Sequence, residues 1–138
     1  MKATIMIVVS LFSLVALPQI HFVDAIGPEK YSVSVTSTSE VLVDQQVQIT
    51  ADLTNNQKRE QPFAYLVQIQ NEDGVTISLS WITGSLAAGQ SMNPSQSWTP
   101  TETGTYQAQI FVWESVANPD ALSAPLTIKI NVVETINT

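Results

Sequence analysis

The amino-acid sequence predicts an all-β protein, a sandwich of about seven antiparallel strands. Apolar residues recur at every second position in several segments, which is the period of a half-buried strand. Turn-forming residues separate these segments roughly every 8–12 residues, as in sandwiches. After residue 25 no stretch has the apolar period of a helix, and the chain shows no internal repeat or low-complexity linker.

The first three strands follow from this alternation. Tyr31, Val33 and Val35 alternate with Ser32, Ser34 and Thr36. Val47, Ile49, Ala51 and Leu53 form one face of a second strand, over 46–53, and a polar loop over 55–60 follows it. Pro62 opens a third strand that carries Phe63, Tyr65, Val67 and Ile69. In each case the apolar set is expected to face the core.

The remaining strands are separated by clear turn signals. Asn71-Glu72-Asp73-Gly74 predicts a hairpin turn, because Asp-Gly tolerates the left-handed backbone of such turns. Val75, Ile77, Leu79 and Trp81 then alternate with Thr76, Ser78 and Ser80. A weaker strand runs from about 92 to 98, interrupted by Pro94. The last two strands carry Tyr106, Ala108, Ile110 and Val112, and then Leu126, Ile128, Ile130 and Val132.

The segment 98–106, Trp-Thr-Pro-Thr-Glu-Thr-Gly-Thr-Tyr, predicts a corner between two strands. Pro100 cannot donate to a ladder and suits a strand end, while Gly104 supplies backbone freedom. Tyr106 enters the next strand with a hydroxyl that is expected to bond to backbone near 101–103, as in a tyrosine corner. This segment resembles the immunoglobulin-like sandwiches of secreted and cell-surface proteins, including archaeal surface proteins.

The resemblance implies a branch of these sandwiches without cysteine. In antibody domains a disulfide joins the two sheets, and one of its cysteines lies two residues after the corner tyrosine. Here that position is Ala108, and the chain has no cysteine at all. The facing residue within 46–53 is therefore expected to be aliphatic, and the core alone is expected to hold the sheets together.

Residues 1–25 resemble a secretory signal peptide, which leaves 26–138 as one sandwich domain. Lys2 precedes an apolar run over 3–17, and Val23-Asp24-Ala25 offers a cleavage site. The run is shorter than the roughly 20 residues of a membrane-spanning helix. The alternative is a pilin-like filament subunit that is cut near Lys2-Ala3 and retains its hydrophobic helix. In that case the chain would touch the membrane only through this uncleaved segment.

Composition limits the chemistry of the chain after residue 25. It has no cysteine and no histidine, which excludes disulfides, thiolate or imidazole metal sites and a Ser-His-Asp triad. The net charge of −7 disfavours nucleic acid and anionic lipid as partners. Glu72 and Asp73 are too few for calcium, which takes roughly 6–8 oxygen ligands, so an ordinary hairpin is favoured there. No cofactor and no catalytic or metal-binding residue are expected.

One candidate interface emerges from the parity of two strands. If Tyr106 to Val112 face inward at alternate positions, Phe111 and Trp113 face outward; by the same rule Leu66 faces outward. These strands are neighbours in an immunoglobulin-like sandwich, so the three side chains are expected to meet in an exposed apolar patch. The alternative is that a bulge or the loop 115–121 covers them.

Together these observations predict a secreted or cell-surface immunoglobulin-like module with a structural, adhesive or binding role and no enzymatic activity. Its expected partner is a protein or glycan at the cell surface, and homo-oligomerisation stays open. An enzyme on this fold is a third alternative, because fold does not fix function.

Overall fold

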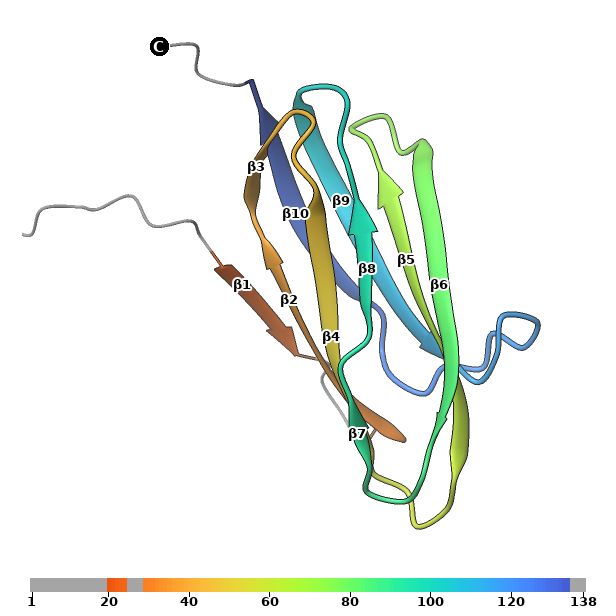
Figure 1. Cartoon of the computed structure of the whole chain (residues 1–138). Helices are drawn as coiled ribbons and strands as arrows, with labels where there is room; N and C mark the ends of the chain where they lie inside the picture. The colour runs from red at the N-terminus through yellow and green to blue at the C-terminus, as the bar shows by residue number, and fades with distance from the viewer. Residues whose placement is uncertain (1–19, 25–28, 135–138) are drawn as a thin grey trace, which may run out of the picture.

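The computed structural model describes residues 20–24 and 29–134, which form a β-sandwich of two sheets (Figure 1). The described residues include no helix, and none of their segments is a helix able to span a membrane. The apolar run predicted to be a signal segment, 3–17, lies outside them, as does Ala25 at the predicted cleavage point. The cleaved signal peptide therefore stays a prediction.

Each sheet contains five strands. Sheet A consists of β1 (Ile20–Asp24), β2 (Tyr31–Thr38), β4 (Val47–Asn55), β7 (Ser91–Met92) and β8 (Ser95–Trp98). Sheet B has the order β3 (Glu40–Leu42), β10 (Leu126–Val133), β9 (Gly104–Trp113), β5 (Gln61–Gln70) and β6 (Thr76–Leu86).

The expectation of about seven antiparallel strands needs two corrections. The described residues form ten strand segments, because short strands lie at the sheet edges and Pro94 divides the weak strand into β7 and β8. Pro94 has no N–H to donate, although its carbonyl still accepts from the Ala51 amide at 3.0 Å. One pair, β3 with β10, is parallel. Only Ser39 separates β2 from β3, and the chain passes from sheet A to sheet B there without reversing its direction.

The core lies between the sheets and is built from the inward positions that the alternation predicts. The side chains at these positions are at most 6% exposed. They are Tyr31, Val33 and Val35 in β2; Val47, Ile49, Ala51 and Leu53 in β4; Phe63, Tyr65, Val67 and Ile69 in β5; Tyr106, Ala108, Ile110 and Val112 in β9; and Leu126, Ile128, Ile130 and Val132 in β10. Burial of this apolar surface is the main stabilising term of the fold.

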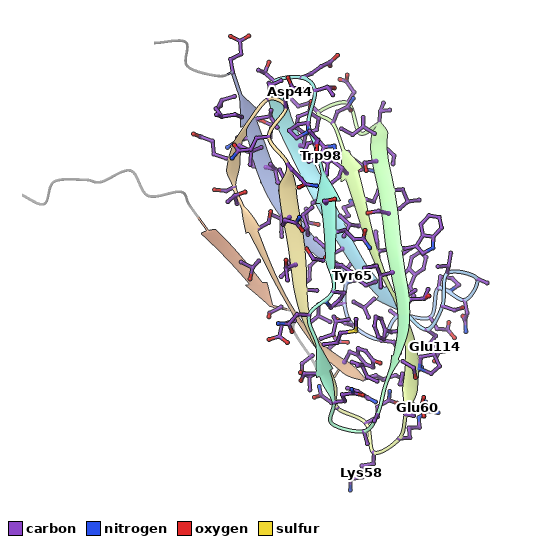
Figure 2. All side chains as sticks on the ribbon, viewed as in Figure 1. Asp44, Lys58, Glu60, Tyr65, Trp98 and Glu114 are labelled. Carbon is purple, nitrogen blue, oxygen red and sulfur yellow. The ribbon has the colours of Figure 1, made fainter. Side chains whose placement is uncertain are left out.

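Two buried tyrosines join the sheets by hydrogen bonds. The Tyr31 hydroxyl of sheet A donates to the Gln61 carbonyl of sheet B at 2.7 Å. The Tyr65 hydroxyl of sheet B donates to the Ile49 carbonyl of sheet A at 2.9 Å, and Tyr65 points into the sandwich in Figure 2. Burial raises the pKa of Tyr31 to about 12 and raises the pKa of Tyr65 as well. Both hydroxyls therefore stay protonated at neutral pH and can keep donating.

The predicted corner is confirmed in its hydrogen bonding. The Tyr106 hydroxyl donates to the Glu102 carbonyl at 2.9 Å. Its ring packs edge-on against Trp98 of sheet A, with ring centroids 5.0 Å apart. Gly104 has a φ of 151°. Residues with a side chain rarely adopt this backbone conformation, so glycine is required at the corner. Desolvation raises the pKa of Tyr106, and the carboxylates of Glu102 and Glu72 add to that rise.

The hairpin turn between β5 and β6 is confirmed at Asn71–Val75. Gly74 has the expected positive φ, 76°. The Asn71 side-chain oxygen accepts from the amides of Asp73 and Val75, both at 3.0 Å, and so holds the turn closed. The turn sets the first pair of the hairpin, Gln70 with Thr76, and a register shift between Ile69 and Gln70 then moves the pairing of the remaining residues by one.

Candidate interface on the outer face of sheet B

The outward side chains of β5 and β9 meet on the solvent face of sheet B. The two strands are antiparallel neighbours, with Leu66 opposite Phe111 and Ala64 opposite Trp113. Residues opposite each other in a ladder point to the same face. The structure therefore places Leu66, Phe111 and Trp113 together, on the side away from the core.

These side chains differ in exposure. Phe111 and Trp113 are partly exposed, and their rings pack with centroids 5.4 Å apart and planes tilted by 46°. Leu66 is only 4% exposed and Ala64 is fully buried, although neither faces the core. Leu66 lies between Trp81 and Phe111 of the neighbouring strands, and Ala64 lies between Thr83 and Trp113. Leu66 is thus the floor of the apolar surface, and the aromatic rings are its accessible part.

β6 extends this apolar surface to the margin of the sheet. Trp81 lies opposite Leu66, and Leu79 lies opposite Gln68. Trp81 is 51% exposed and Leu79 is 53% exposed. We define the aromatic patch as Leu66, Leu79, Trp81, Phe111 and Trp113. One row of it, Trp81–Leu66–Phe111, crosses three strands.

Trp81 and Leu79 belong to the patch, but the alternation of inward and outward positions within β5 and β9 does not predict them. The hairpin turn alone does not reveal them, because counting outward from Asn71–Val75 would set Ser80 opposite Leu66. The register shift between Ile69 and Gln70 moves the pairing by one residue and sets Trp81 opposite Leu66, so Trp81 shares the outward face of Leu66.

The loop 115–121, which was considered as a cover for Phe111 and Trp113, ends beside Trp113 in the ladder of sheet B. Ala121 forms an antiparallel bridge with Trp113, and the Leu122 amide donates to the Val112 carbonyl at 2.8 Å. Ala121 and Leu122 thus extend sheet B along the side of β9 away from β5. Both aromatic rings remain partly exposed.

Charged side chains are absent from the three strands that build the patch. None of β5, β6 and β9 contains Asp, Glu, Lys or Arg. Figure 2 shows Asp44 at one end of the sandwich and Lys58 with Glu60 at the other. The Lys30–Glu114 pair, at 3.7 Å, is partly exposed. Such surface pairs contribute little to stability. Of the charges labelled in Figure 2, Asp44, Lys58 and Glu60 lie towards the ends of the sandwich, whereas Glu114 directly follows Trp113 at the margin of the patch.

The residues considered for calcium have another role. Glu72 accepts a hydrogen bond from the Thr105 amide at 3.0 Å and thereby ties the β5–β6 turn to β9. Within the part of the chain that the structure describes, no three His, Cys, Asp or Glu side chains gather where they could hold a metal. The geometry of this region favours the hairpin interpretation.

The fold defines a class, the immunoglobulin-like sandwiches, and the comparisons with known proteins specify the family. A family model described as S-layer A-like (SlaA-like) matches residues 11–137. The chain therefore belongs to the S-layer A-like family. No curated protein matches it.

Solved structures support the fold. A CARDB domain from Pyrococcus furiosus, described in complex with di-metal ions, is 19% identical, with a TM-score of 0.62 over 78% of this chain and 96% of that one. The C-terminal domain of wzt is 12% identical, with a TM-score of 0.61 over 88% and 83% of the two chains. A β-glucosidase from Listeria innocua is 10% identical, with a TM-score of 0.60 over 75% of this chain and 16% of that one. At these identities the likeness concerns the fold alone.

Family and fold together indicate a cell-surface or extracellular structural module. The matching family is named for a surface layer, and the immunoglobulin-like sandwich is the predicted architecture. The comparisons lend no support to the pilin-like alternative. The glycosidase likeness covers a small part of that enzyme and carries no activity to this chain.

Proposed function

We propose that this protein is a non-enzymatic module of the cell surface whose aromatic patch binds another component of the surface, a protein or a glycan. The observation that carries the proposal is the patch itself. Trp81 and Leu79 are each about half exposed on an outer sheet face, next to the paired rings of Phe111 and Trp113. Exposed apolar surface of this kind usually marks an interaction site.

Aromatic side chains suit such a role on physical grounds. They supply a large contact area with few rotatable bonds, so little conformational entropy is lost when they are buried. Tryptophan is enriched among the residues that dominate binding energy. The same rings can also stack on the apolar faces of sugar rings, so a glycan partner fits the patch as well as a protein does.

The test replaces Phe111→Ser and Trp113→Thr in one variant. Because both side chains face away from the core, we expect the free energy of unfolding to fall by only about 1–2 kcal/mol, from the loss of their partial burial. Association with the cell-surface material that copurifies with the unmodified protein should weaken strongly, and this is measured by pull-down and analytical ultracentrifugation.

Met92→Ser is the matched control. Met92 is an exposed apolar residue in β7 of sheet A, so this variant also loses an exposed apolar side chain, on the other sheet. Binding should be unchanged in it. A double variant that unfolds would show that Phe111 and Trp113 act in the fold, and a folded double variant that keeps full binding would show that they do not act in association.

A further inference from the structure

The free margin of sheet B provides a second kind of contact, through its backbone. β6 is 11 residues long and, among the described strands, pairs on one side only, with β5 (Figure 1). On its other side, N–H and C=O groups of the strand point away from the sheet and can pair with another strand. Other edge strands of the described part are shorter, from two residues in β7 to five in β1, and the eight-residue β2 is an edge only when β1 is removed with the predicted signal peptide.

β6 also lacks the features that usually protect a sheet edge. Natural edge strands are blunted by charged side chains, by proline or by bulges that turn the edge away. From Thr76 to Leu86 the strand contains no charged residue and no proline. A register irregularity occurs near Ile69 and Gln70 of β5, opposite the start of β6. The remainder, 78–86, is a regular and unprotected edge.

Charge restricts what can approach this edge. The chain has a net charge of −7, so two copies repel each other over most orientations. A contact through β6 brings together strands that carry no charge of their own, and Glu60, whose carboxylate accepts from the Ser85 hydroxyl at 2.9 Å, lies near the end of the strand. The centre of the strand, around Ser80, can therefore meet a second copy of this chain without burying a charge of its own.

We propose that β6 pairs with β6 of a second copy in an antiparallel, two-fold arrangement that joins the two B sheets into one. This deepens the proposed function and rests on it, because it names a partner for part of the aromatic patch. In a two-fold antiparallel pair, the numbers of any two residues that lie opposite each other add up to the same value. Because of the pleat, two opposite residues must also face the same side of the sheet. Several registers centred within 78–86 satisfy this condition.

The apolar pattern selects one register among them. Centring on Ser80 puts Leu79 opposite Trp81 of the second copy, and Trp81 opposite Leu79 of that copy. The two outward apolar residues of the strand then contact each other twice, in cross-strand pairs of the kind that stabilise sheets. Within each chain Trp81 also lies opposite Leu66, so the pairs continue the row towards Phe111.

The first test measures association of the full chain as it is exported by an expression host. Sedimentation equilibrium should show a dimer. Leu79→Lys combined with Trp81→Lys should raise the dissociation constant at least about 30-fold, the effect of losing one dominant contact residue. The matched control, Thr36→Lys with Ser97→Lys, adds the same charge at outward positions of sheet A and should leave the dimer intact.

The second test is specific for the register. One chain carries Leu79→Glu and another carries Trp81→Lys. Mixed together, they place the introduced carboxylate opposite the introduced ammonium, while the second Trp–Leu pair remains. The mixture should form heterodimers more tightly than either variant pairs with itself. No preference for the mixed pair would overturn the Ser80-centred register.

Hydrogen exchange reports on the backbone pairing itself. Within 78–86, the amides whose N–H groups point away from β5 should become protected from hydrogen exchange as the protein concentration rises through the dissociation constant. A chain that stays monomeric at all concentrations, or a dimer without this protection, would overturn β6 pairing. Binding of the Phe111→Ser/Trp113→Thr variant to surface material is read separately, so the proposed function can stand or fail independently of this inference.

Discussion

Sheets A and B present opposite surfaces to the solvent although both obey the same two-residue alternation. The outer face of sheet A is a ladder of small polar side chains. Thr50 donates to Ser95 at 3.0 Å, and Ser95 donates to Gln48 at 2.7 Å. The outer face of sheet B carries the aromatic patch at its centre and margin.

This difference between the sheets shows that the inward positions of the strands, and not the outward ones, specify the fold. Inward positions are mostly apolar in both sheets and build one core, with polar exceptions at the edge strands such as Ser78 and Ser80 of β6 and Gln96 of β8. Outward positions vary without changing that core. On sheet A they satisfy one another by hydrogen bonds across the strands, whereas on sheet B they leave apolar area in contact with water. A surface of the second kind has free energy to gain from a partner, and a surface of the first kind has little.

The largest expected effect tests whether inward and outward positions of one strand differ as described. Tyr106 is an inward side chain of β9 that is 6% exposed. Tyr106→Ala leaves a cavity there, so it should cost about 3–5 kcal/mol in urea unfolding. Tyr106→Phe keeps the ring and loses only the bond to the Glu102 carbonyl. It should therefore cost about 1 kcal/mol, the net contribution of one hydrogen bond. Equal stability of both variants and the unmodified protein would show that the corner does not hold the sheets.

An effect of intermediate size on the free energy of unfolding is expected at alkaline pH. It arises from tyrosines between the two sheets and involves neither outer face. Burial raises the folded pKa of Tyr31 to about 12 and raises that of Tyr65 as well. Both lie above the unfolded value of roughly 10. Their contribution is therefore fully present below the unfolded pKa and is lost as the pH rises through the folded pKa. Each tyrosine should remove up to about 1.4 kcal/mol per pH unit above that unfolded value.

Denaturant unfolding at pH 9, 10 and 11 measures this slope, and Tyr65→Phe supplies its control. That variant should lose its share of the slope and keep the share of Tyr31. A free energy of unfolding that stays level across this range would mean that the hydroxyls are not buried donors.

The smallest effect concerns the polar face of sheet A. Ser95→Ala removes the side-chain bonds to Thr50 and Gln48. Because these bonds are partly exposed to water, the change should cost about 1 kcal/mol or less and leave association unchanged. Ser97→Ala, on the same short strand, serves as the reference in thermal unfolding. If Ser95→Ala weakened association instead, the contrast between a self-satisfied face and a binding face would be wrong.

Much of the fold could be predicted because local patterns determine it. The inward residues of five strands follow from alternation, and the corner hydroxyl follows from the spacing of Pro100, Gly104 and Tyr106. The parallel pairing of β3 with β10 could not be predicted, because it depends on contacts between residues far apart in the sequence, such as Asn131 with Glu40. The three-residue β3 is too short to show any period.

The candidate site was predictable only in part for a related reason. The alternation within β9 is enough to predict that Phe111 and Trp113 face the same side of the sheet. The expectation that β5 and β9 are neighbours then adds Leu66. β6 breaks the usual rule that the apolar side of an alternating strand faces the core. Its inward positions include Ser78 and Ser80, while Leu79 and Trp81 face solvent. That the patch is an interface stays a prediction.

The position of β1 gives the predicted export signal a consequence for the sheet itself. β1 pairs with β2 from Ser34 to Thr38 and forms the outermost strand of sheet A. Cleavage after Ala25 would remove this strand whole, so β2 would become an edge only once the leader is gone.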